Sequence, residues 1–276
     1  MRISFYFFLM LLFSCRQNNT PVKNPQGYSL QHPYIINLPS DLDEISGLSY
    51  YQKDKSIFAI SDETGFLYKI TAISAKTNIK KWEFGKKSDF EDLVLLDSTF
   101  YILQSNGNIH VVNFISADSI YTQKTEFPGK GKNEFETLYY DSSQKKLVLL
   151  CKNCDADDQN SISAYLFDPQ TKTYVDTVIT LNISELTKNI KAKNFVFKAS
   201  AAAENPVTGE LFVLSSVNKL LLVLDKDKKV KEFYPLDPGL FKQPEGLTFS
   251  ANGNMIISNE AGHAGAANIL IFNYQK

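Results

Sequence analysis

The sequence predicts an all-β protein, a β-propeller of five four-stranded blades. Three observations support this prediction: a short signature that recurs along the chain, apolar runs of strand length after each copy, and turn residues between the runs. Short strands at regular spacing with turns between them are typical of all-β folds. The composition of the 276 residues agrees, because 13% are aromatic and nearly all of these are Phe or Tyr, which favour strands.

The recurring signature sets the size of the repeating unit. It ends in Leu four times and in Ala once, in residues 45–48, 90–93, 135–138, 199–202 and 244–247. Successive copies lie about 45 residues apart, except for one longer interval of about 64 residues between the third and the fourth. A unit of about 45 residues that holds four strands has the dimensions of a propeller blade.

Further apolar runs after each signature predict the rest of each blade. The second strands are expected at 56–61, 99–104, 146–151, 210–215 and 254–258. The third strands are expected at 66–71, 108–114, 161–167, 219–224 and 268–273. In four units a more polar fourth strand follows, such as 78–84 or 230–235, but the last unit ends without one. The lone apolar segment 33–39 is expected to fill that place and remove an open sheet edge.

The longer interval between the third and fourth units contains residues 183–191. Apolar residues recur there at helical spacing after a start with Ser and Glu. This pattern predicts a short amphipathic helix inserted between two blades. The alternative is that the interval hides a degenerate sixth blade.

Residues 1–15 have the pattern of an export signal that lies outside the fold. Arg2 precedes an apolar run that is too short to span a bilayer but has the length of a signal-peptide core. The ending Leu-Phe-Ser-Cys resembles a bacterial lipobox, in which the Cys, here Cys15, is lipidated and becomes the mature N-terminus. An ordinary signal with a chance Cys and a short anchor are the alternatives.

Residues 16–31 are polar and lack apolar periodicity, which predicts a flexible tether before a propeller domain at 32–276. We therefore expect an exported monomer, anchored by its lipid on the periplasmic side of a membrane or at the cell surface. A small polar ligand or an envelope protein is its expected partner. The net charge of −1 argues against a nucleic-acid partner, because binding to the phosphate backbone needs a basic face.

Cys151 and Cys154 have the spacing of a redox or metal half-site. No second Cys pair or His pair completes a zinc site, and the strand–helix context of a thioredoxin motif is missing. A local disulfide or two free thiols is the favoured interpretation. The loop that follows, with Asp155, Asp157 and Asp158, lacks the Gly and the terminal Glu of an EF-hand and is expected to be solvated.

Five stretches of the chain, taken in order, carry a family resemblance. They are Glu-Ile-Ser-Gly-Leu-Ser-Tyr with Phe-Ala-Ile-Ser-Asp-Glu, Phe-Glu-Thr-Leu-Tyr-Tyr-Asp, Asn-Pro-Val-Thr-Gly-Glu-Leu-Phe-Val-Leu-Ser-Ser, and Gln-Pro-Glu-Gly-Leu-Thr-Phe. The set resembles the SdiA-regulated (YjiK-like) β-propeller family and runs from about residue 40 to the C-terminus. The resemblance implies a β-propeller of exported or envelope proteins and implies no established activity.

A propeller gathers residues from all of its blades at one mouth of the central channel, where the loops entering the inner strands meet those joining second and third strands. The residue two before each signature end is Ser46, Glu91, Glu136, Ser200 or Glu245, and Glu44 lies just outside this set. The ends of the second strands add Asp62, Glu63, Lys152, Asn153, Ser216, Asn259 and Glu260. The sequence thus predicts an acidic ligand site at this mouth, with Lys152 as its cation.

Two interpretations of this site compete. Each signature Glu could hold its own loop through local bonds, or the carboxylates could bind a cation or a polar ligand together. Glu91, Glu136 and Glu245 are the candidate metal ligands, expected within reach of one guest, and Ca²⁺ is the candidate ion because it takes about six to eight oxygens. Lys152 argues against a cage of purely calcium type and is a candidate partner for Glu136.

Enzyme motifs are missing, since the sequence has no nucleophile elbow, metalloprotease His pair or Gly-rich phosphate loop. The first hypothesis is therefore a non-catalytic binding or protein-interaction module. By analogy with other propellers, the alternative is a metal-dependent hydrolase of lactonase, phosphodiesterase or phytase type. Glu136 or Glu245 would then be the base, and His263, on a Gly/Ala loop that could close over a ligand, is a further candidate.

Overall fold

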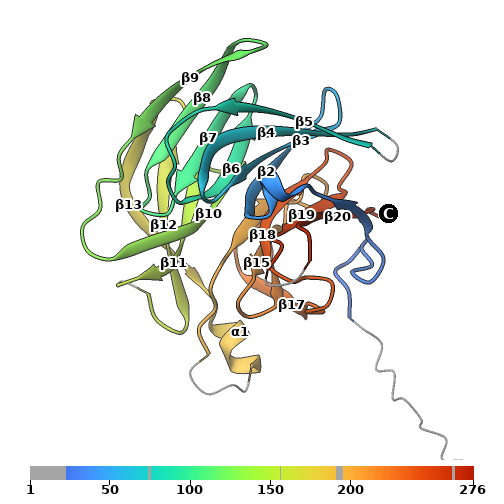
Figure 1. Ribbon diagram of the computed structural model, residues 1–276. Coiled ribbons are helices and arrows are strands. Elements are labelled where there is room, and N and C mark those ends of the chain that lie inside the picture. The colour runs from blue at the N-terminus through green and yellow to red at the C-terminus, as the bar shows by residue number, and fades with distance from the viewer. Residues whose placement is uncertain (1–22, 74–75, 156, 191–194, 263–264) are drawn as a thin grey trace, which may run out of the picture.

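The computed structural model describes residues 23–73, 76–155, 157–190, 195–262 and 265–276. They form five antiparallel sheets of four strands each (Figure 1). The first strand of each sheet contacts the first strand of the next, and the fifth sheet contacts the first, so the ring is closed. The predicted five-bladed propeller is confirmed, and the six-bladed alternative is wrong.

The strands follow the predicted repeat. Blade 1 consists of β2 (Ile45–Tyr51), β3 (Ser56–Ser61), β4 (Thr64–Ile73) and β5 (Lys76–Glu83). Blade 2 consists of β6 (Phe90–Leu96), β7 (Thr99–Gln104), β8 (Ile109–Ser116) and β9 (Ser119–Thr125). Blade 3 consists of β10 (Asn133–Asp141), β11 (Lys146–Cys154), β12 (Ser161–Asp168) and β13 (Thr173–Asn182). Blade 4 consists of β14 (Ala201–Glu204), β15 (Leu211–Ser215), β16 (Leu220–Leu224) and β17 (Val230–Pro235).

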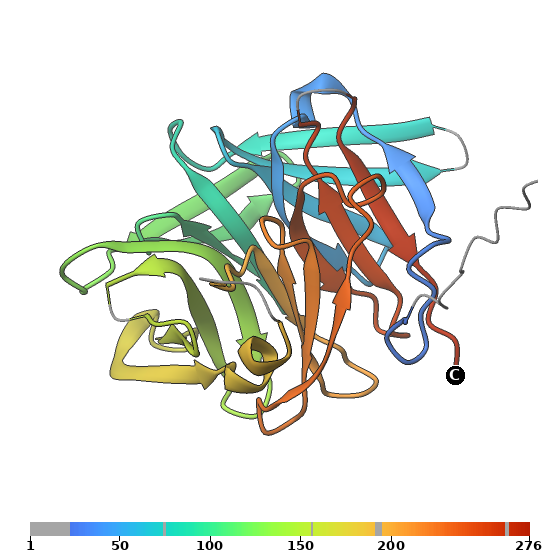
Figure 2. The same ribbon diagram turned by 90° about the horizontal axis from the view of Figure 1, so that it is seen from below.

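Blade 5 joins the two ends of the chain. Its strands are β18 (Pro244–Phe249), β19 (Met255–Asn259), β20 (Asn268–Phe272) and, on the outside, β1 (Tyr34–Asn37). β1 pairs with β20 in antiparallel register, with Ile36 opposite Ile269, and Figure 2 shows the two strands side by side. The N-terminal strand therefore covers the edge that β20 would otherwise expose, as the sequence predicts.

Part of the expected tether belongs to the folded domain. Tyr28 and Leu30 are buried, with 6% and 3% of their surface exposed, and pack in the apolar cluster of blades 4 and 5. The Tyr28 hydroxyl donates to the Gly253 carbonyl at 2.6 Å and accepts from Asn205 Nδ2 at 2.8 Å. The expectation of a flexible tether is thus wrong for residues 23–31. Residues 16–22 and Cys15 lie outside the described residues.

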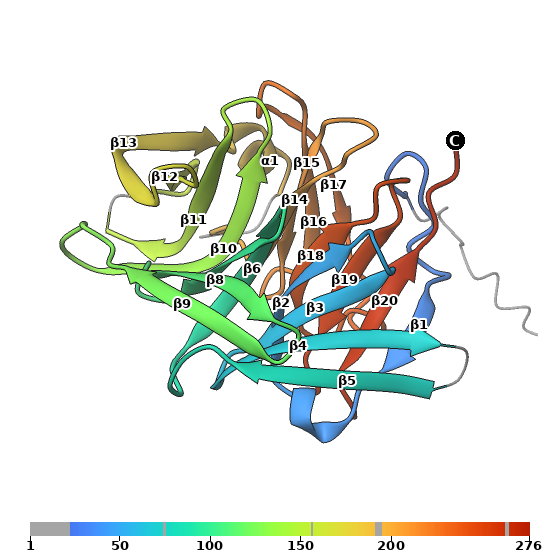
Figure 3. The ribbon, with the colours of Figure 1, turned by 90° about the horizontal axis from the view of Figure 1, so that it is seen from above.

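The interval between blades 3 and 4 holds a short helix and not a sixth blade. The helix α1 (Ser184–Asn189) lies within the predicted 183–191 segment and buries Leu186 (Figure 3). A 3₁₀ turn, η1 (Ser40–Leu42), leads into β2. No helix of the described ranges is long and apolar enough to cross a membrane.

Burial explains why the second strands read as unbroken apolar runs. β3, β15 and β19 are buried at every position, because each lies inside a sheet that is covered by a neighbouring blade on both faces. Polar side chains in the innermost strands then bond across blades. Asp92 Oδ2 of blade 2, for example, accepts from Leu138 N of blade 3 at 2.7 Å. Such bonds hold adjacent inner strands at a set height along the channel.

Candidate functional site

Backbone hydrogen bonds between blades build the channel mouth. Asp62, after β3, accepts at its carbonyl from Phe90 N of blade 2 at 2.9 Å, and Ser105 accepts from Phe135 N of blade 3 at 2.9 Å. Ala261 N, after β19, donates to the Asp43 carbonyl before β2 at 2.9 Å. At these three junctions the turn after a second strand is thereby held against the start of the next inner strand. The predicted mouth-forming segments do meet.

Three carboxylates gather where blade 5 meets blade 1. We name Glu44, Asp62 and Glu260 the acidic trio, because one oxygen of each lies within 4.8 Å of the other two. Glu44 precedes β2, Asp62 follows β3 and Glu260 follows β19, so the trio exists only in the closed ring. Asp62 Oδ1 is buried and has no hydrogen-bond partner among the described residues. Three converging carboxylates with an unsatisfied oxygen favour a cation.

The electrostatics of the trio agree with its crowding. Burial first, and then the charges of Glu44, Glu63 and Asp89, together raise the pKa of Asp62 to about 6. Burial likewise raises the pKa of Glu260 to about 8, with additional contributions from Glu245, Asp62 and Glu44. Gln243 Nε2 donates to Glu260 and opposes this shift in part. Like charges held together resist ionisation, so a bound cation would stabilise the ionised trio.

A second group of carboxylates surrounds Lys152. We name Lys152, Glu91, Glu136 and Glu245 the lysine cluster, and its members come from β6, β10, β11 and β18. Lys152 Nζ forms an ion pair with Glu136, as the sequence suggested, and lies 4.0 Å from Glu134 Oε1. The positive charge of Lys152 also opposes the rise in pKa that other groups cause at Glu91 and Glu245. Glu136 thus contacts this ammonium group, and Glu91 and Glu245 lie close enough on the same rim for its charge to act on them.

Burial is the largest cause of the pKa shifts of Glu91 and Glu245, the two carboxyl groups of the lysine cluster without an ion pair among the described residues. It raises the pKa of Glu91 to about 9, with Asp89 and Glu245 adding to the shift. It raises the pKa of Glu245 to about 7, although a hydrogen bond from Ser216 and the charge of Lys152 oppose it. The mouth thus holds carboxyl groups that can carry a proton at neutral pH.

The metal-ligand prediction for Glu91, Glu136 and Glu245 stays a prediction, and the acidic trio is a second candidate. Glu91, Glu136 and Glu245 do not form a group with converging oxygens, whereas the acidic trio does. The physical reason is Lys152, which already supplies the positive charge among the signature Glu residues. The acidic trio, which has no lysine among its members, is therefore the candidate cation site with converging oxygens.

Two predicted ligand residues have structural partners. Ser46 Oγ donates to the Phe90 carbonyl at 2.9 Å, and Ser200 Oγ donates to the Pro244 carbonyl at 2.8 Å. Both hydroxyls are buried and bond to the inner strand of the following blade. We therefore remove Ser46 and Ser200 from the candidate ligand set.

Other predicted residues lie at the rim or outside the described part. Glu63 forms an exposed ion pair with Lys87 at 2.7 Å. Asn259 Nδ2 donates to the Leu240 carbonyl at 3.2 Å and to Asn268 Oδ1 at 3.0 Å, while its own Oδ1 is buried and unpaired within the described residues. His263 lies outside the described residues.

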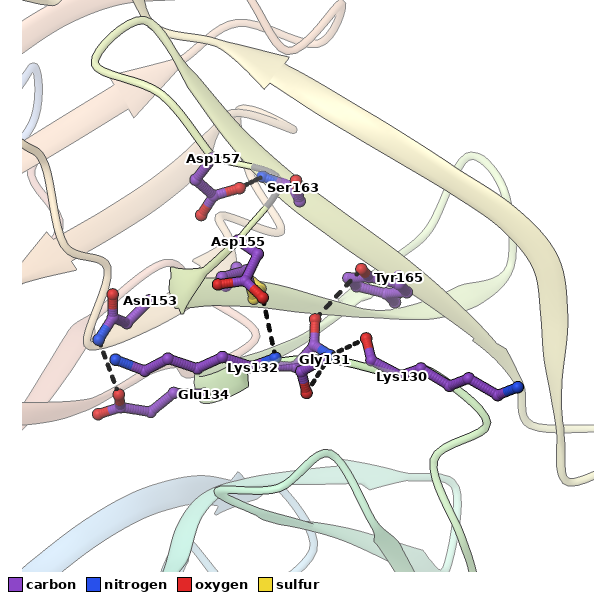
Figure 4. The surroundings of a disulfide bond; sticks show 12 residues. Lys130, Gly131, Lys132, Glu134, Asn153, Asp155, Asp157, Ser163 and Tyr165 are labelled. Atoms are coloured by element: carbon purple, nitrogen blue, oxygen red, sulfur yellow. Dashed lines mark hydrogen bonds between the residues drawn. A yellow bond between two sulfur atoms is a disulfide. The ribbon is translucent and has the colours of Figure 1, made fainter.

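A disulfide fixes the loop that carries Lys152. Cys151 and Cys154 are bonded, which is one of the two expected forms, and Figure 4 shows the surroundings of this bond. The two cysteines flank Lys152 and Asn153 in the sequence. Asn153 Nδ2 donates to Glu134 Oε2 at 3.1 Å, as Figure 4 shows. Strand β10 is bulged opposite this loop, at Glu134, Phe135 and Thr137. The disulfide and the bulge together direct two side chains of β11 toward the acidic start of β10.

Sequence reasoning missed Asp89, whose charge raises the pKa of both Asp62 and Glu91. The repeat contains a pattern that could have identified Asp89. Asp89 lies two residues before Glu91, as Glu44 lies two residues before Ser46 and Glu134 lies two before Glu136. The other two units have Lys198 and Gln243 at this position, so an alignment of the units predicts acidic residues outside the signature in blades 1, 2 and 3.

The opposite mouth of the channel differs in chemistry. A cavity of about 470 Å³ lies there, lined by the signature residues Leu48, Leu93, Leu138, Ala202 and Leu247 and by polar groups such as Glu204 and Asn205. Neither the acidic trio nor the lysine cluster lines this cavity. The chemically distinctive mouth is therefore the acidic one.

Comparison with known proteins identifies the family. The SdiA-regulated family model matches residues 36–262, which is most of the propeller. The chain belongs to the SdiA-regulated family. Its resemblance to this family, and the β-propeller that the resemblance implies, are thereby confirmed. No curated protein matches the sequence.

Solved structures share the fold of this SdiA-regulated propeller at low identity. Glutaminyl cyclase from Myxococcus xanthus has a TM-score of 0.54 at 12% identity, over 88% of this chain and 98% of that one. A luciferin-regenerating enzyme has a TM-score of 0.53 at 9% identity, over 88% of this chain and 95% of that one. At these identities the likeness concerns the fold alone.

Proposed function

We propose that this SdiA-regulated protein is an exported, membrane-tethered propeller lipoprotein that binds a divalent cation, Ca²⁺ in the first place, at its acidic channel mouth. The observation that carries the proposal is the acidic trio, whose oxygens lie within 4.8 Å of one another with Asp62 Oδ1 unpaired among the described residues. The leader ending at Cys15 supports export and lipid anchoring. The module is non-catalytic in this proposal and presents the bound ion to a polar ligand or an envelope protein.

The lysine cluster supports a polar ligand beside the ion. Lys152 and the protonatable Glu91 and Glu245 offer hydrogen-bond donors, and the acidic trio would hold a cation at the neighbouring blade interface. A ligand with both anionic and hydroxyl groups would meet both kinds of partner.

Calcium binding is tested on the full chain in detergent by thermal unfolding and calorimetry. Ca²⁺ at a concentration of about 100 times its Kd should raise Tm by about 5 °C or more, because the ion binds only the folded ring. Asp62→Asn should abolish this rise, since it removes the central charge of the trio. Glu83→Gln is the control, because Glu83 is exposed on β5 and lies outside the trio.

The exposed Glu44 provides a second variant if Asp62→Asn fails to fold. Glu44→Gln should weaken Ca²⁺ binding about tenfold or more. A wild-type chain whose Tm and calorimetric heat do not change with Ca²⁺, or a Ca²⁺ response equal in wild type and in Asp62→Asn, would contradict the proposal.

A metal-dependent hydrolase is the second candidate, and Glu245 is the observation that favours it. A pKa of about 7 suits a general base near neutral pH. Glu136 is less suited, because Lys152 holds it in an ion pair. A panel of lactones and phosphodiesters with Ca²⁺ tests this candidate. Hydrolysis that falls about a hundredfold or more in Glu245→Gln would support it, and hydrolysis unchanged in that variant would dismiss it.

A further inference from the structure

The groove between blades 1 and 2 lies apart from the channel and has a different chemistry. It encloses a cavity of about 510 Å³ between strands β2 to β5 and strands β6 to β8. Five aromatic residues line it: Tyr51, Phe58, Trp82, Phe100 and Phe114. Trp82 is the single Trp of the sequence. A cavity of this size with aromatic walls and a few polar groups is the usual form of a small-ligand site.

The rings of this groove are held in place and partly accessible. Trp82 packs edge-on against Phe114, with ring centroids 4.9 Å apart, and Phe58 lies 4.7 Å from Phe100. Trp82 Nε1 donates to the Ala117 carbonyl at 3.1 Å, which fixes the plane of the indole. Trp82 and Phe114 remain half-buried, so they present ring surface to the groove. A rigid, partly open ring can stack against a flat ligand at little entropic cost.

The polar part of the groove is basic. Lys80 lines the groove, is exposed, and forms no ion pair with any described residue. Lys69 also lines it, is paired with Asp54, and stands 5.5 Å from the centre of the Tyr51 ring. No described lining residue carries a carboxylate. In a chain of net charge −1, this local excess of positive charge is complementary to an anionic ligand.

We propose that the groove between blades 1 and 2 binds an acidic saccharide, a short chain of uronic acid units. The face of a sugar ring would stack on Trp82, a carboxylate would pair with Lys80, and hydroxyls would bond to the side chains of Asn78 and Asn113, which line the same groove. Half of the lining is polar, which disfavours a fatty acid.

The full chain in detergent, titrated with trigalacturonate, tests this proposal. Trp82 emission reports the groove directly, because no other Trp contributes, and calorimetry gives an independent Kd. We expect a saturable change in emission with a Kd below about 1 mM. Lys80→Glu should weaken binding about tenfold or more. Lys81→Glu is the matched control, because the next residue of β5 points to the other face of the sheet and does not line the groove.

Trp82→Phe removes the fluorescent reporter, so its binding is measured by calorimetry. We expect this variant to bind trigalacturonate more weakly than wild type. Its Tm should stay close to that of wild type. The proposal is overturned if trigalacturonate causes neither emission change nor heat at about 10 mM. It is also overturned if Lys80→Glu and Trp82→Phe bind as wild type does, or if a neutral trisaccharide, a fatty acid or an oligonucleotide binds more tightly than trigalacturonate.

Discussion

Glu91 is a half-buried carboxyl group with other carboxyl groups nearby. Burial, Asp89 and Glu245 raise its pKa, and the ammonium of Lys152 offsets only part of the shift. Its hydrogen bond with Asp89 also favours the protonated form, in which the Glu91 hydroxyl donates to the carboxylate. A group whose folded-state pKa exceeds its unfolded-state pKa binds protons preferentially in the folded protein. Glu91 therefore stabilises the fold at low pH and ceases to do so as the pH rises.

The variant Glu91→Gln tests this linkage. The pKa of Glu91 rises from 4.5 to about 9, so the wild-type contribution is complete below about pH 4.5 and is lost toward pH 9. The amide stays neutral and keeps a donor for Asp89. We expect the difference in Tm, variant minus wild type, to become more positive from pH 5 to pH 9. Glu83→Gln, at an exposed position of β5, is the control and should give a flat difference. A flat difference for Glu91→Gln would contradict the burial of an ionisable Glu91.

The repeat identified most of the residues at the mouth but not their roles. Position in the repeat correctly brought Glu91, Glu136 and Glu245 to one rim. It treated Ser46 and Ser200 as their equivalents, although a short hydroxyl reaches the neighbouring backbone while a longer carboxylate extends into the channel. The role of a side chain depends on its reach and on its partners, which the spacing of a repeat does not encode.

At the scale of elements, the end of β11 shows how local chemistry shapes the site. The segment from Cys151 to Cys154 is closed into a small ring, and Cys151 is fully buried. Lys152, inside this ring, has its ammonium on Glu136. The disulfide therefore restricts the loop that delivers the cation of the lysine cluster.

Replacement of both cysteines by serine should lower the free energy of unfolding by about 2 kcal/mol, because a ring of about four residues constrains the unfolded chain only modestly. Urea denaturation of the full chain measures this value. A reducing agent should destabilise the wild type to a similar extent and leave the double variant unchanged. Alkylation of both thiols in the untreated native protein would show that the bond is not formed and would contradict the prediction.

At the scale of the whole molecule, the ring is closed by residues from the two ends of the chain. β1 contributes one buried face, with Ile36 in the apolar cluster of blades 1 and 5, and one exposed face, with Ile35 outside it. This closure also brings Glu260 of blade 5 to Glu44 and Asp62 of blade 1. The candidate cation site thus depends on the same closure as the stability of the propeller.

The two isoleucines of β1 form a matched pair for testing this closure. Ile36→Ala should cost about 2–4 kcal/mol of unfolding free energy, because Ile36 is 7% exposed and its removal leaves a cavity. Ile35→Ala should cost less than about 1 kcal/mol, since Ile35 is 46% exposed. Denaturant unfolding of both variants measures the difference. Equal losses in the two variants would contradict the pairing of β1 with β20.

The sequence by itself predicted most strand positions, the closing strand and the inserted helix, and it favoured five blades over six. These features follow from local patterns, because alternating and unbroken apolar runs of strand length recur in every unit. Only the tertiary structure decided which carboxylates meet. Glu44 and Glu260 are far apart along the chain and come together through ring closure, while Lys152 reaches Glu136 from the neighbouring strand and neutralises it. Electrostatic interaction depends on distances between side-chain atoms, and the packing of whole blades sets those distances.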